Sequence, residues 1–460
     1  MTYSRQSFTE VCGREGMMKS PTDSKEKVIA ADGLSVMMET HGCKLNQADT
    51  QLLSRELGIA GYTVAQNIEE ADVYVLNTCT VTHVADRKAR QAVRAAKRRN
   101  PNSIVVVTGC YAQRSPDDLS SMPEIDLVAG NVSKPSLAGM IGNLASDPDS
   151  ACAVGSDEAL AQVLRIRSRA MVKIQEGCDQ VCAYCIVPTV RGRERSIPVD
   201  DIVATAKSYA DMGCQEVVLT GTQLGSYGFD LENTDIADLV RNLLERTEVP
   251  RIRISSLQPQ DISDDLLALW NDPRLCPHFH VPLQSGSDSV LKTMRRRYTS
   301  AEFQRSIRQV KEAVPGVAVT ADAIVGFPGE TESDFQETVS ACVEAGLASV
   351  HVFPYSIRPG TSAAYFDDQV DPTVKSGRVK ELTAVVDDLA RRFREASVGQ
   401  TRPVLWERAT SSDKGMVWQG LTDNYLRTRA QSESDLANRI TLAALESFDG
   451  DVMNARIPGE

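Results

Sequence analysis

Short apolar runs alternate with longer stretches of helical spacing along the first third of the chain. Apolar runs near Val36, Val73 and Val105 are separated by stretches in which apolar residues recur every three or four positions. This alternation is typical of a parallel α/β sheet whose strands are connected by helices. A polar segment of small residues follows, and we expect a linker there, over 146–163.

The same alternation resumes at Ala170 and continues through six apolar segments. They read MVKIQ, EVVLTG, RIRISS, HFHVPL, AVTADAIVGF and SVHVFPYS. Six β/α units of this kind predict a full or partial β/α barrel. Beyond a helix near 380–395, the last sixty or so residues are β-rich and turn-separated, which predicts a small β-barrel.

The chain is therefore expected to be an α/β protein with three domains. An N-terminal parallel α/β domain, a central partial β/α barrel and a C-terminal small β-barrel fit a length of 460 residues, since domains usually hold about 100 to 200 residues. The expected ranges are 1–32 for a disordered tail, 33–145 for the N-terminal domain, 146–163 for the linker, 164–396 for the central barrel and 397–460 for the small barrel. Because no heptads or repeats are visible, we expect a monomer.

The composition is that of a soluble protein in a reducing compartment. No apolar run approaches the roughly 20 residues that a membrane helix needs, and the first thirty residues lack the apolar core of a signal peptide. We therefore expect a cytoplasmic protein without a membrane partner. Eleven cysteines in such a chain indicate metal or catalytic thiols more than disulfides. The net charge of -12 argues against binding nucleic acid over the whole surface, but it allows a local basic patch.

Cys178, Cys182 and Cys185 lie within eight residues of one another, in the segment EGCDQVCAYCIVP. Thiolates this close can reach one metal centre from a single loop, and iron–sulfur clusters prefer cysteine ligands. Three cysteines would leave the fourth iron of a 4Fe-4S cluster open to bind a small molecule. A zinc site short of one ligand and cysteines that merely pack in the interior are the alternatives, and neither predicts this spacing.

Three further cysteines, Cys43, Cys79 and Cys110, each follow a predicted strand of the first domain. The carboxyl ends of parallel strands share one edge of a sheet, so these thiols could converge on a second cluster. Taken singly, each is better explained as a buried or incidental thiol, and it is their repeated placement that favours a cluster. The other five are expected to be structural or incidental: Cys12, Cys152, Cys214, Cys276 and Cys342.

The Cys-x3-Cys-x2-Cys spacing, with Tyr184 before the last cysteine, resembles the signature of the radical SAM superfamily. Together with the first-domain cysteines, the chain resembles the methylthiotransferase family within it, from about Ser35 to the end. The segments that carry this resemblance are GCKLNQAD, NTC, TGCYAQ, EGCDQVCAYCIVPTVRGRERS, VVLTGTQLGSYG, RIRISSLQP, HVPLQSGSDSVLKTMRRRYT, IVGFPGET and VFPYSIRPGT.

The resemblance implies two 4Fe-4S clusters. One would lie on the radical SAM triplet (Cys178, Cys182, Cys185), where the open iron binds S-adenosylmethionine, and the other on the auxiliary triplet (Cys43, Cys79, Cys110). In the family, one S-adenosylmethionine supplies the methyl group of a methylthio unit on the auxiliary cluster, and a second gives the radical that removes hydrogen from the substrate carbon. The resemblance also implies a flavodoxin- or ferredoxin-like electron donor and a C-terminal TRAM-type barrel that binds RNA.

The motif GCKLNQAD resembles the branch that methylthiolates C2 of N6-threonylcarbamoyladenosine at position 37 of tRNA, next to the anticodon. Methylthiolation of N6-isopentenyladenosine at the same position, or a non-catalytic iron–sulfur protein that binds RNA, are the alternatives. The chain departs from the pattern at two places. Gln223 stands where the branch commonly has histidine, and no glycine precedes the strand ANRITLAA.

Several other residues are candidates for binding cofactor or RNA. At the strand ends of a β/α barrel, glycines could let a ligand approach closely. The expected S-adenosylmethionine pocket consists of Tyr184, Gly221, Gly225, Ser255, Gln284 and Gly326. The candidate RNA contacts are Arg191, Arg193, Arg295, Arg296 and Arg297, for which a solvated charged face is the alternative. Trp406, Trp418 and Tyr425 are expected in the core of the small barrel more than as platforms for bases.

Overall fold

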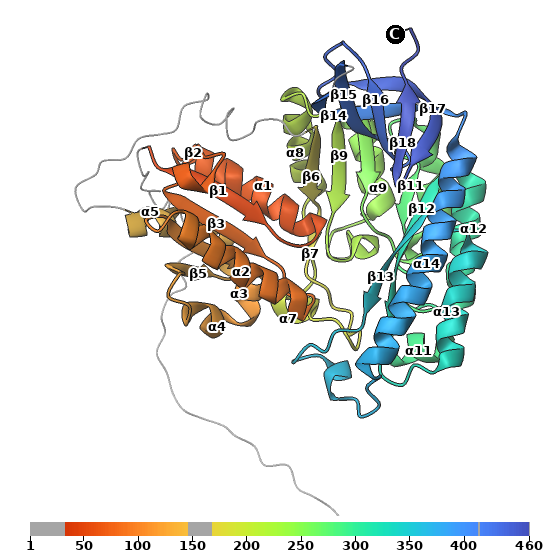
Figure 1. Ribbon diagram of the computed structural model, residues 1–460, viewed down its shortest axis with the longest axis horizontal. Coiled ribbons are helices and arrows are strands. Elements are labelled where there is room, and N and C mark those ends of the chain that lie inside the picture. Colours follow the sequence, from red (N-terminus) through yellow and green to blue (C-terminus); the bar gives the residue numbers. More distant parts are fainter. Residues whose placement is uncertain (1–32, 146–167, 413–414, 460) are drawn as a thin grey trace, which may run out of the picture.

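The computed structural model describes residues 33–145, 168–412 and 415–459 (Figure 1). The predicted tail (1–32) and the predicted linker (146–163) lie outside these ranges, as do Cys12 and Cys152. The described residues form a parallel α/β sheet, an open β/α arc and a closed small barrel, which confirms the predicted fold class. No helix in the described part of the chain has the length and apolar character to cross a membrane.

The N-terminal sheet contains five parallel strands in the order β2-β1-β3-β4-β5. The strands are β1 (Ser35–Thr40), β2 (Thr63–Val64), β3 (Val73–Thr78), β4 (Ile104–Gly109) and β5 (Leu127–Ala129). The helices are α1 (Lys44–Ile59), α2 (His83–Arg99), α3 (Cys110–Arg114), α4 (Pro116–Ser120) and α5 (Leu137–Ala145). Leu57 of α1 and Ile141 of α5 pack on one face of the sheet, and Val93 of α2 and Leu119 of α4 pack on the other.

The central domain is an arc of six parallel strands. These are β6 (Arg169–Lys173), β9 (Glu216–Thr220), β10 (Arg251–Ile254), β11 (His278–His280), β12 (Ala318–Val325) and β13 (Ser349–Pro354). They form two sheets, β10-β9-β6 and β11-β12-β13, which a bridge between Ile252 and Leu275 joins in the order β6-β9-β10-β11-β12-β13. The arc is thus the predicted partial barrel.

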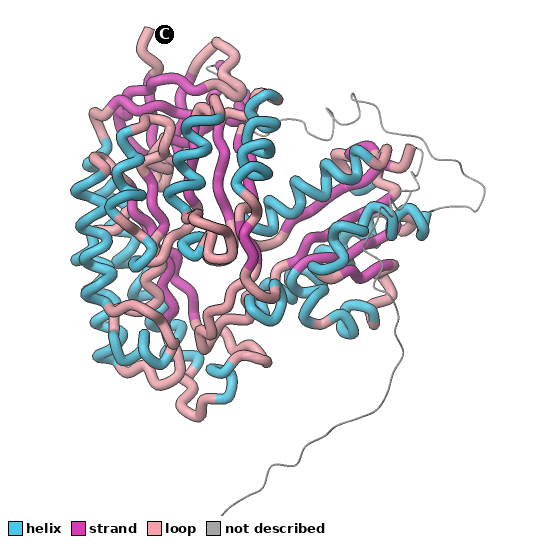
Figure 2. The backbone as a smooth tube through the Cα atoms, turned by 180° about the vertical axis from the view of Figure 1, so that it is seen from behind, coloured by secondary structure: helices cyan, strands magenta, loops and turns pink. Residues whose placement is uncertain are grey.

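Helices cover the outer face of this arc (Figure 2). They include α8 (Val199–Asp211), α9 (Ile236–Arg246), α12 (Ser300–Ala313), α13 (Glu332–Ala345) and α14 (Pro372–Ser397). The shorter helices are α7 (Val187–Arg191), α10 (Asp264–Leu267) and α11 (Asp288–Thr293). A small hairpin of β7 (Gln175–Glu176) and β8 (Arg195–Ser196) encloses the segment that carries the radical SAM triplet and α7.

The C-terminal strands close into a barrel in the order β14-β15-β16-β18-β17. They are β14 (Thr401–Ser412), β15 (Gly415–Thr422), β16 (Arg427–Gln431), β17 (Ile440–Asp449) and β18 (Val452–Arg456). Trp406 and Trp418 are buried in its core, as predicted. Asn438 adopts the left-handed conformation just before β17, with a φ of 58°. Asparagine tolerates this conformation better than most residues with a side chain.

The small barrel packs over the amino ends of the central strands. Arg251 and Arg253 of β10 donate to the carbonyls of Thr422 and Asp423, at 2.9 Å and 3.0 Å. Both arginines also pair with Glu216 of β9, which is fully buried. At the β6 edge of the arc, α1 packs along β6, and the Gln51 side chain accepts a hydrogen bond from the Met171 amide at 2.8 Å. The three domains therefore meet around the open side of the arc.

Candidate active site at the meeting of two cysteine triplets

The auxiliary triplet lies at the carboxyl ends of three neighbouring strands. Cys43 caps the amino end of α1 after β1, Cys79 follows β3, and Cys110 is the first residue of α3 after β4. Because β1, β3 and β4 are adjacent in the sheet, the fold brings together three residues that are far apart in the sequence. Gly42 makes this approach possible, since its φ is 114° and a Cβ there would lie 2.7 Å from the Cβ of Cys79.

The radical SAM triplet occupies the loop between β7 and α7. The Cys178 amide donates to the carbonyl of Gly192 at 3.2 Å, and the Cys185 amide donates to the carbonyl of Cys182 at 3.1 Å. Ala183, between the cysteines, is tied to the Met294 carbonyl at 3.0 Å. The loop is therefore held from both sides by backbone hydrogen bonds.

The chemistry of both triplets fits iron–sulfur clusters. All six cysteines are free thiols, three of them half-buried and two buried, with Cys43 exposed. Burial raises the pKa of Cys79 to about 11, and the neighbouring Cys43 and Cys110 add to this effect. Among the described residues, no group of three or more His, Cys, Asp or Glu side chains is close enough together to hold one metal ion. In a 4Fe-4S cluster each cysteine binds a different iron, so the thiols stand further apart than the ligands of one ion.

The helix α7 lies between the two triplets. It begins two residues after Cys185, and its Val190 packs with Ile186 against Cys110. Asn131 bridges the same contact, because its amide donates to the Val190 carbonyl at 2.8 Å and lies 3.8 Å from the Cys110 sulfur. The two sets of cysteines are thus neighbours in space, separated by one turn of helix and its side chains.

A buried ionic network fixes α7 to the N-terminal domain. Arg191, the last residue of α7, pairs with Asp49 of α1 at 2.7 Å and with Glu176 at 2.8 Å. Asp49 also binds Lys134 at 2.6 Å and Lys173 at 2.9 Å. Burial opposes ionisation of Asp49, but these three cations outweigh it and hold the pKa of Asp49 below its usual value.

A second buried link joins the domains beside Cys79. Arg358, in the loop after β13, donates to the Thr80 carbonyl at 2.6 Å and to the Asp86 carboxylate at 2.7 Å. Arg358 and Asp86 are both buried, and Thr80 directly follows Cys79 in the sequence. This link therefore positions the second auxiliary cysteine relative to the carboxyl ends of the central strands.

A polar network lies beside the radical SAM triplet. Arg296 donates to the Cys182 sulfur at 3.4 Å and to the Gln258 side chain at 2.9 Å. Gln223 binds Gln258 and donates to Asp261 at 3.0 Å, and burial raises the pKa of Asp261 to about 6. Sequence reasoning missed Gln258 and Asp261, although Gln258 lies in the segment RIRISSLQP at the carboxyl end of β10.

The structure changes the interpretation of the three glycines expected in the cofactor pocket. A Cβ on Gly225 would lie 1.9 Å from the Asp261 carboxylate, and one on Gly326 would lie 2.0 Å from the Lys375 side chain. A Cβ on Gly221 would lie 2.9 Å from the Gln175 carbonyl. Protein atoms approach all three glycines, so each has a structural reason to lack a side chain, and their part in the cofactor pocket stays a prediction.

The other expected pocket residues are dispersed around the arc. Tyr184 packs edge-on against Phe327, with ring centroids 6.5 Å apart. Gln284 lies four residues beyond the end of β11 in the left-handed conformation, with a φ of 61°, and its amide donates to the Asp322 carbonyl. Ser255 borders the large cavity described below, together with Gly221.

The candidate RNA contacts separate into two groups. Arg191 is buried in the ionic network, and Arg296 is half-buried with its guanidinium at Cys182, so protein groups bind both side chains and their contact with RNA stays a prediction. Arg193, Arg295 and Arg297 are exposed. Of these, Arg193 forms an ion pair with Asp179 at 2.7 Å.

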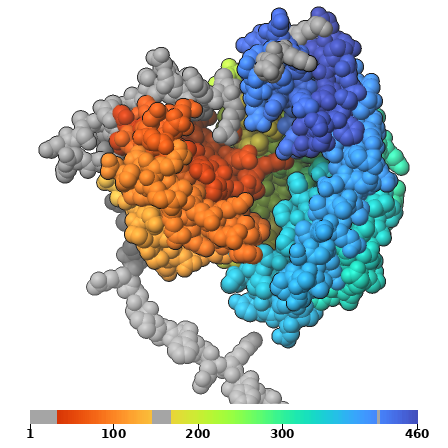
Figure 3. All heavy atoms as spheres, viewed as in Figure 1, coloured from red at the N-terminus to blue at the C-terminus, as the bar shows by residue number. Residues whose placement is uncertain are grey.

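A cavity of about 1150 Å³ lies where the three domains meet, in the hollow between the N-terminal domain and the small barrel (Figure 3). Cys43 borders it, whereas the other five cysteines of the two triplets do not. Its wall contains six Lys and Arg residues and three Asp and Glu residues. These are Lys44, Arg169, Arg394, Arg408, Arg427 and Arg429, against Asp322, Glu407 and Asp451. An acidic protein thus has a basic cavity that one of its auxiliary cysteines, Cys43, borders.

Aromatic and histidine side chains form one wall of this cavity. Tyr425 of the small barrel stacks on His278 of β11, with ring centroids 4.4 Å apart, so this tyrosine is not a core residue as predicted. Asp322 binds His280 and His351, each at 3.2 Å. The hydrogen bond to Asp322 raises the pKa of His351.

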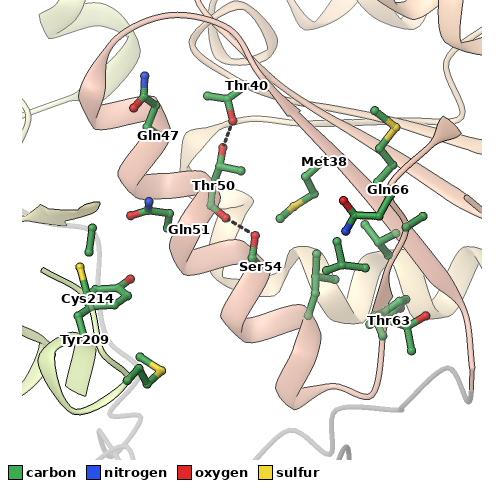
Figure 4. Close-up of a pocket in the computed structure, with 18 of the residues that line it drawn as sticks. Met38, Thr40, Gln47, Thr50, Gln51, Ser54, Thr63, Gln66, Tyr209 and Cys214 are labelled. Carbon is green, nitrogen blue, oxygen red and sulfur yellow. Dashed lines mark hydrogen bonds between the residues drawn. The ribbon is translucent and has the colours of Figure 1, made fainter. Parts of the chain in front are cut away.

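A second, smaller cavity of about 360 Å³ lies between α1 and the start of the central domain (Figure 4). Gln47, Gln51 and Ser54 of α1 line one side, and Tyr209 and Cys214 line the other (Figure 4). None of the six triplet cysteines borders it. Three of the cysteines outside the triplets, Cys214, Cys276 and Cys342, are buried.

Comparison with known proteins identifies the family to which this chain belongs. The model described as Uncharacterized protein family UPF0004 matches residues 35–130, and the Radical SAM superfamily model matches residues 172–342. A threonylcarbamoyladenosine tRNA methylthiotransferase, MtaB, of Bacillus subtilis (strain 168) is 39% identical over 416 residues, covering 88% of this chain and 92% of that protein. MtaB of Aquifex aeolicus (strain VF5) is 36% identical, covering 88% of this chain and 99% of that protein.

Other relatives carry a different name. A tRNA-2-methylthio-N(6)-dimethylallyladenosine synthase of Alkaliphilus oremlandii (strain OhILAs) is 33% identical, covering 91% of this chain and 92% of that protein. The radical S-adenosylmethionine methyltransferase TsrM from Kitasatospora setae shares the fold, with a TM-score of 0.55, 13% identity, and coverage of 78% of this chain and 89% of that one. The chain therefore belongs to the radical SAM methylthiotransferases, enzymes that modify tRNA with S-adenosylmethionine and two 4Fe-4S clusters as cofactors.

Proposed function

We propose that this enzyme adds a methylthio group to C2 of N6-threonylcarbamoyladenosine at position 37 of tRNA. The observation that carries the proposal is the meeting of the two cysteine triplets across α7, which fits two clusters that serve one substrate. The choice of substrate is supported by the MtaB relatives, at 39% and 36% identity, against 33% for the dimethylallyladenosine synthase. Isopentenyladenosine at the same position is the second candidate, since that synthase also matches 91% of the chain.

The two triplets are proposed to hold one 4Fe-4S cluster each. Bound there, the clusters and S-adenosylmethionine supply the radical chemistry and the methylthio sulfur. The chain itself supplies position and charge. Arg191 and Arg358 link the domain that carries the auxiliary cysteines to the central domain, and the Arg296 guanidinium places a positive charge beside the sulfur of Cys182. Gln258 and Asp261 provide polar groups for S-adenosylmethionine beside this triplet.

The basic cavity is proposed to receive the anticodon loop. Its six cationic side chains outnumber its three carboxylates, and several of them, including Arg408 and Arg427, are exposed on the small barrel. Phosphate contacts from such residues supply most of the sequence-independent affinity for RNA. Because Cys43 borders the same cavity, a base that enters it can reach the auxiliary triplet at this cysteine.

Nucleoside analysis of tRNA from a strain that lacks this gene tests the proposal. We expect the 2-methylthio derivative of threonylcarbamoyladenosine to disappear, and the unmethylthiolated nucleoside to accumulate. The wild-type gene and a Cys342→Ala variant should restore the derivative, since Cys342 is a buried cysteine outside both triplets, whereas Cys182→Ala should not. Persistence of the derivative in the deletion strain, or loss of the isopentenyl derivative instead, would refute the choice of substrate.

A further inference from the structure

The ammonium group of Lys44 is the charged group nearest in sequence to the auxiliary site. Lys44 directly follows Cys43, is half-buried, and borders the large cavity together with it. Within the described residues, no carboxylate forms an ion pair with Lys44. Its ammonium group lies over the ring of Tyr425, whose centroid is 5.6 Å from Nζ. The domain that carries the auxiliary cysteines thus presents a cation to the cavity without a matching anion.

The charges around Lys44 are already paired with one another. Arg169 binds Glu407 at 2.6 Å, Arg253 binds Glu216 at 2.9 Å, and Asp322 is held by two histidines. None of these carboxylates forms an ion pair with Lys44. A desolvated cation is costly unless it is paired, so a ligand that brings an anion to this point would be bound favourably.

The wall beside Lys44 contains a residue with a strained backbone. Tyr425 adopts a φ of 75°, a conformation that is unusual for a residue with a side chain, between β15 and β16. This conformation brings its ring over His278, and the Arg253 guanidinium lies 4.9 Å from the ring centroid. Strained residues concentrate at ligand sites, because the surrounding structure must hold them in place. Lys44 and Tyr425 together form a cationic and aromatic corner at the junction of two domains.

The two candidate substrates differ in the group that would meet this corner. The threonylcarbamoyl group ends in a carboxylate, whereas the isopentenyl group is apolar and uncharged. Both are attached to the base that must come next to Cys43. An unpaired ammonium one residue away complements only the first of them, and it would disfavour an apolar group, which cannot replace the lost water.

We propose that Lys44 determines specificity by binding the carboxylate of the threonylcarbamoyl group, with Tyr425 as the adjoining wall. This inference rests on the proposed function and adds to it the residue that distinguishes the two modified adenosines. Lys44 is not assigned a part in the transfer itself. Its contribution is to binding, through one charge-assisted hydrogen bond, and such a bond corresponds to about 10- to 100-fold in affinity.

The test compares the affinities of three anticodon stem–loop RNAs for the reconstituted enzyme. They carry threonylcarbamoyladenosine, the methyl ester of the same nucleoside, or isopentenyladenosine, and are otherwise identical. The proteins are the wild type, Lys44→Gln, Lys44→Arg, and Lys88→Gln as a control with an exposed lysine of the same domain. Iron per chain is measured for each, so that equally loaded enzymes are compared.

We expect the wild type to bind the free acid at least about tenfold more tightly than the ester. Lys44→Gln should abolish this ratio, Lys44→Arg should keep most of it, and Lys88→Gln should keep all of it. An unchanged ratio in Lys44→Gln, or an equal loss of affinity for the acid and the ester, would overturn the role of Lys44 alone. A wild type that methylthiolates the isopentenyl RNA and not the threonylcarbamoyl RNA would overturn the proposed function, and the role of Lys44 with it.

Discussion

Asp49→Asn should weaken the contact between the N-terminal domain and α7 without changing a residue of either cysteine triplet. Asp49 is buried, with 2% of its surface exposed, and its carboxylate binds Lys134, Arg191 and Lys173 at 2.6 to 2.9 Å. Asparagine keeps the shape and removes the charge, so three cations lose their common anion. Arg191 and Lys173 belong to the central domain, and the substitution therefore weakens both the N-terminal domain and its contact with α7.

The size of the effect follows from the burial of the network. Removing one member of a buried ion pair usually costs about 3 to 5 kcal/mol, because the remaining charge is left unpaired. Arg191 and Lys173 retain Glu176, at 2.8 Å and 3.2 Å, so we expect the lower end, about 3 kcal/mol. The three contacts share one carboxylate and cannot be added together.

Chemical denaturation under anaerobic conditions measures this loss, and hydrogen exchange at α7 (Val187–Arg191) shows where it falls. Faster exchange is expected at α7 and at the amino-terminal half of α1. The control is Glu69→Gln, which removes an exposed ion pair with Arg99 on the same domain and should change stability little. A loss below about 1 kcal/mol for Asp49→Asn, with unchanged exchange at α7, would refute the account of this network.

Three further predictions concern the cluster site, pH and RNA. In Gly42→Ala, the added Cβ would lie 2.7 Å from the Cβ of Cys79, on a residue whose φ is 114°. The auxiliary cluster should therefore be lost, and iron analysis should give about half the iron per chain of the wild type, whereas full loading would contradict this. Burial opposes ionisation of Glu216, but Arg253 and Arg251 lower its pKa to about 2. The ionised carboxylate therefore contributes about 3 kcal/mol to the free energy of unfolding above pH 4.5, and this contribution is lost as the pH falls towards 2. Denaturation as a function of pH should show a weaker pH dependence of stability in Glu216→Gln. In Arg408→Gln, tRNA affinity should fall and its salt dependence should become shallower by about one ion, and an unchanged slope in binding titrations would exclude Arg408 from the RNA contact.

The sequence predicted the features that depend on strand periodicity. Each auxiliary cysteine follows a strong apolar run, and because parallel strands end at one edge, the convergence of Cys43, Cys79 and Cys110 could be predicted without coordinates. The six strands of the central arc and the closed small barrel were predicted for the same reason.

The features that the sequence did not reveal depend on partners far along the chain. The run that contains Arg191 is indistinguishable locally from a solvated basic face, and its partner Asp49 lies 142 residues away. A glycine in the sequence does not tell which atom approaches it, and at Gly225 this is the carboxylate of Asp261, 36 residues further along the chain. Tyr425 was predicted in the core because an aromatic residue in a β-rich segment usually is, and its left-handed backbone has no local signal.

Two cysteine triplets that lie on either side of α7 are proposed to hold one 4Fe-4S cluster each. Iron analysis with Mössbauer spectroscopy on the anaerobically reconstituted protein tests this most directly. We expect about eight irons per chain, all in 4Fe-4S clusters, and about four in a variant with all three cysteines of either triplet replaced by alanine. About four irons in the wild type, or eight in the variant that lacks Cys43, Cys79 and Cys110, would contradict the claim.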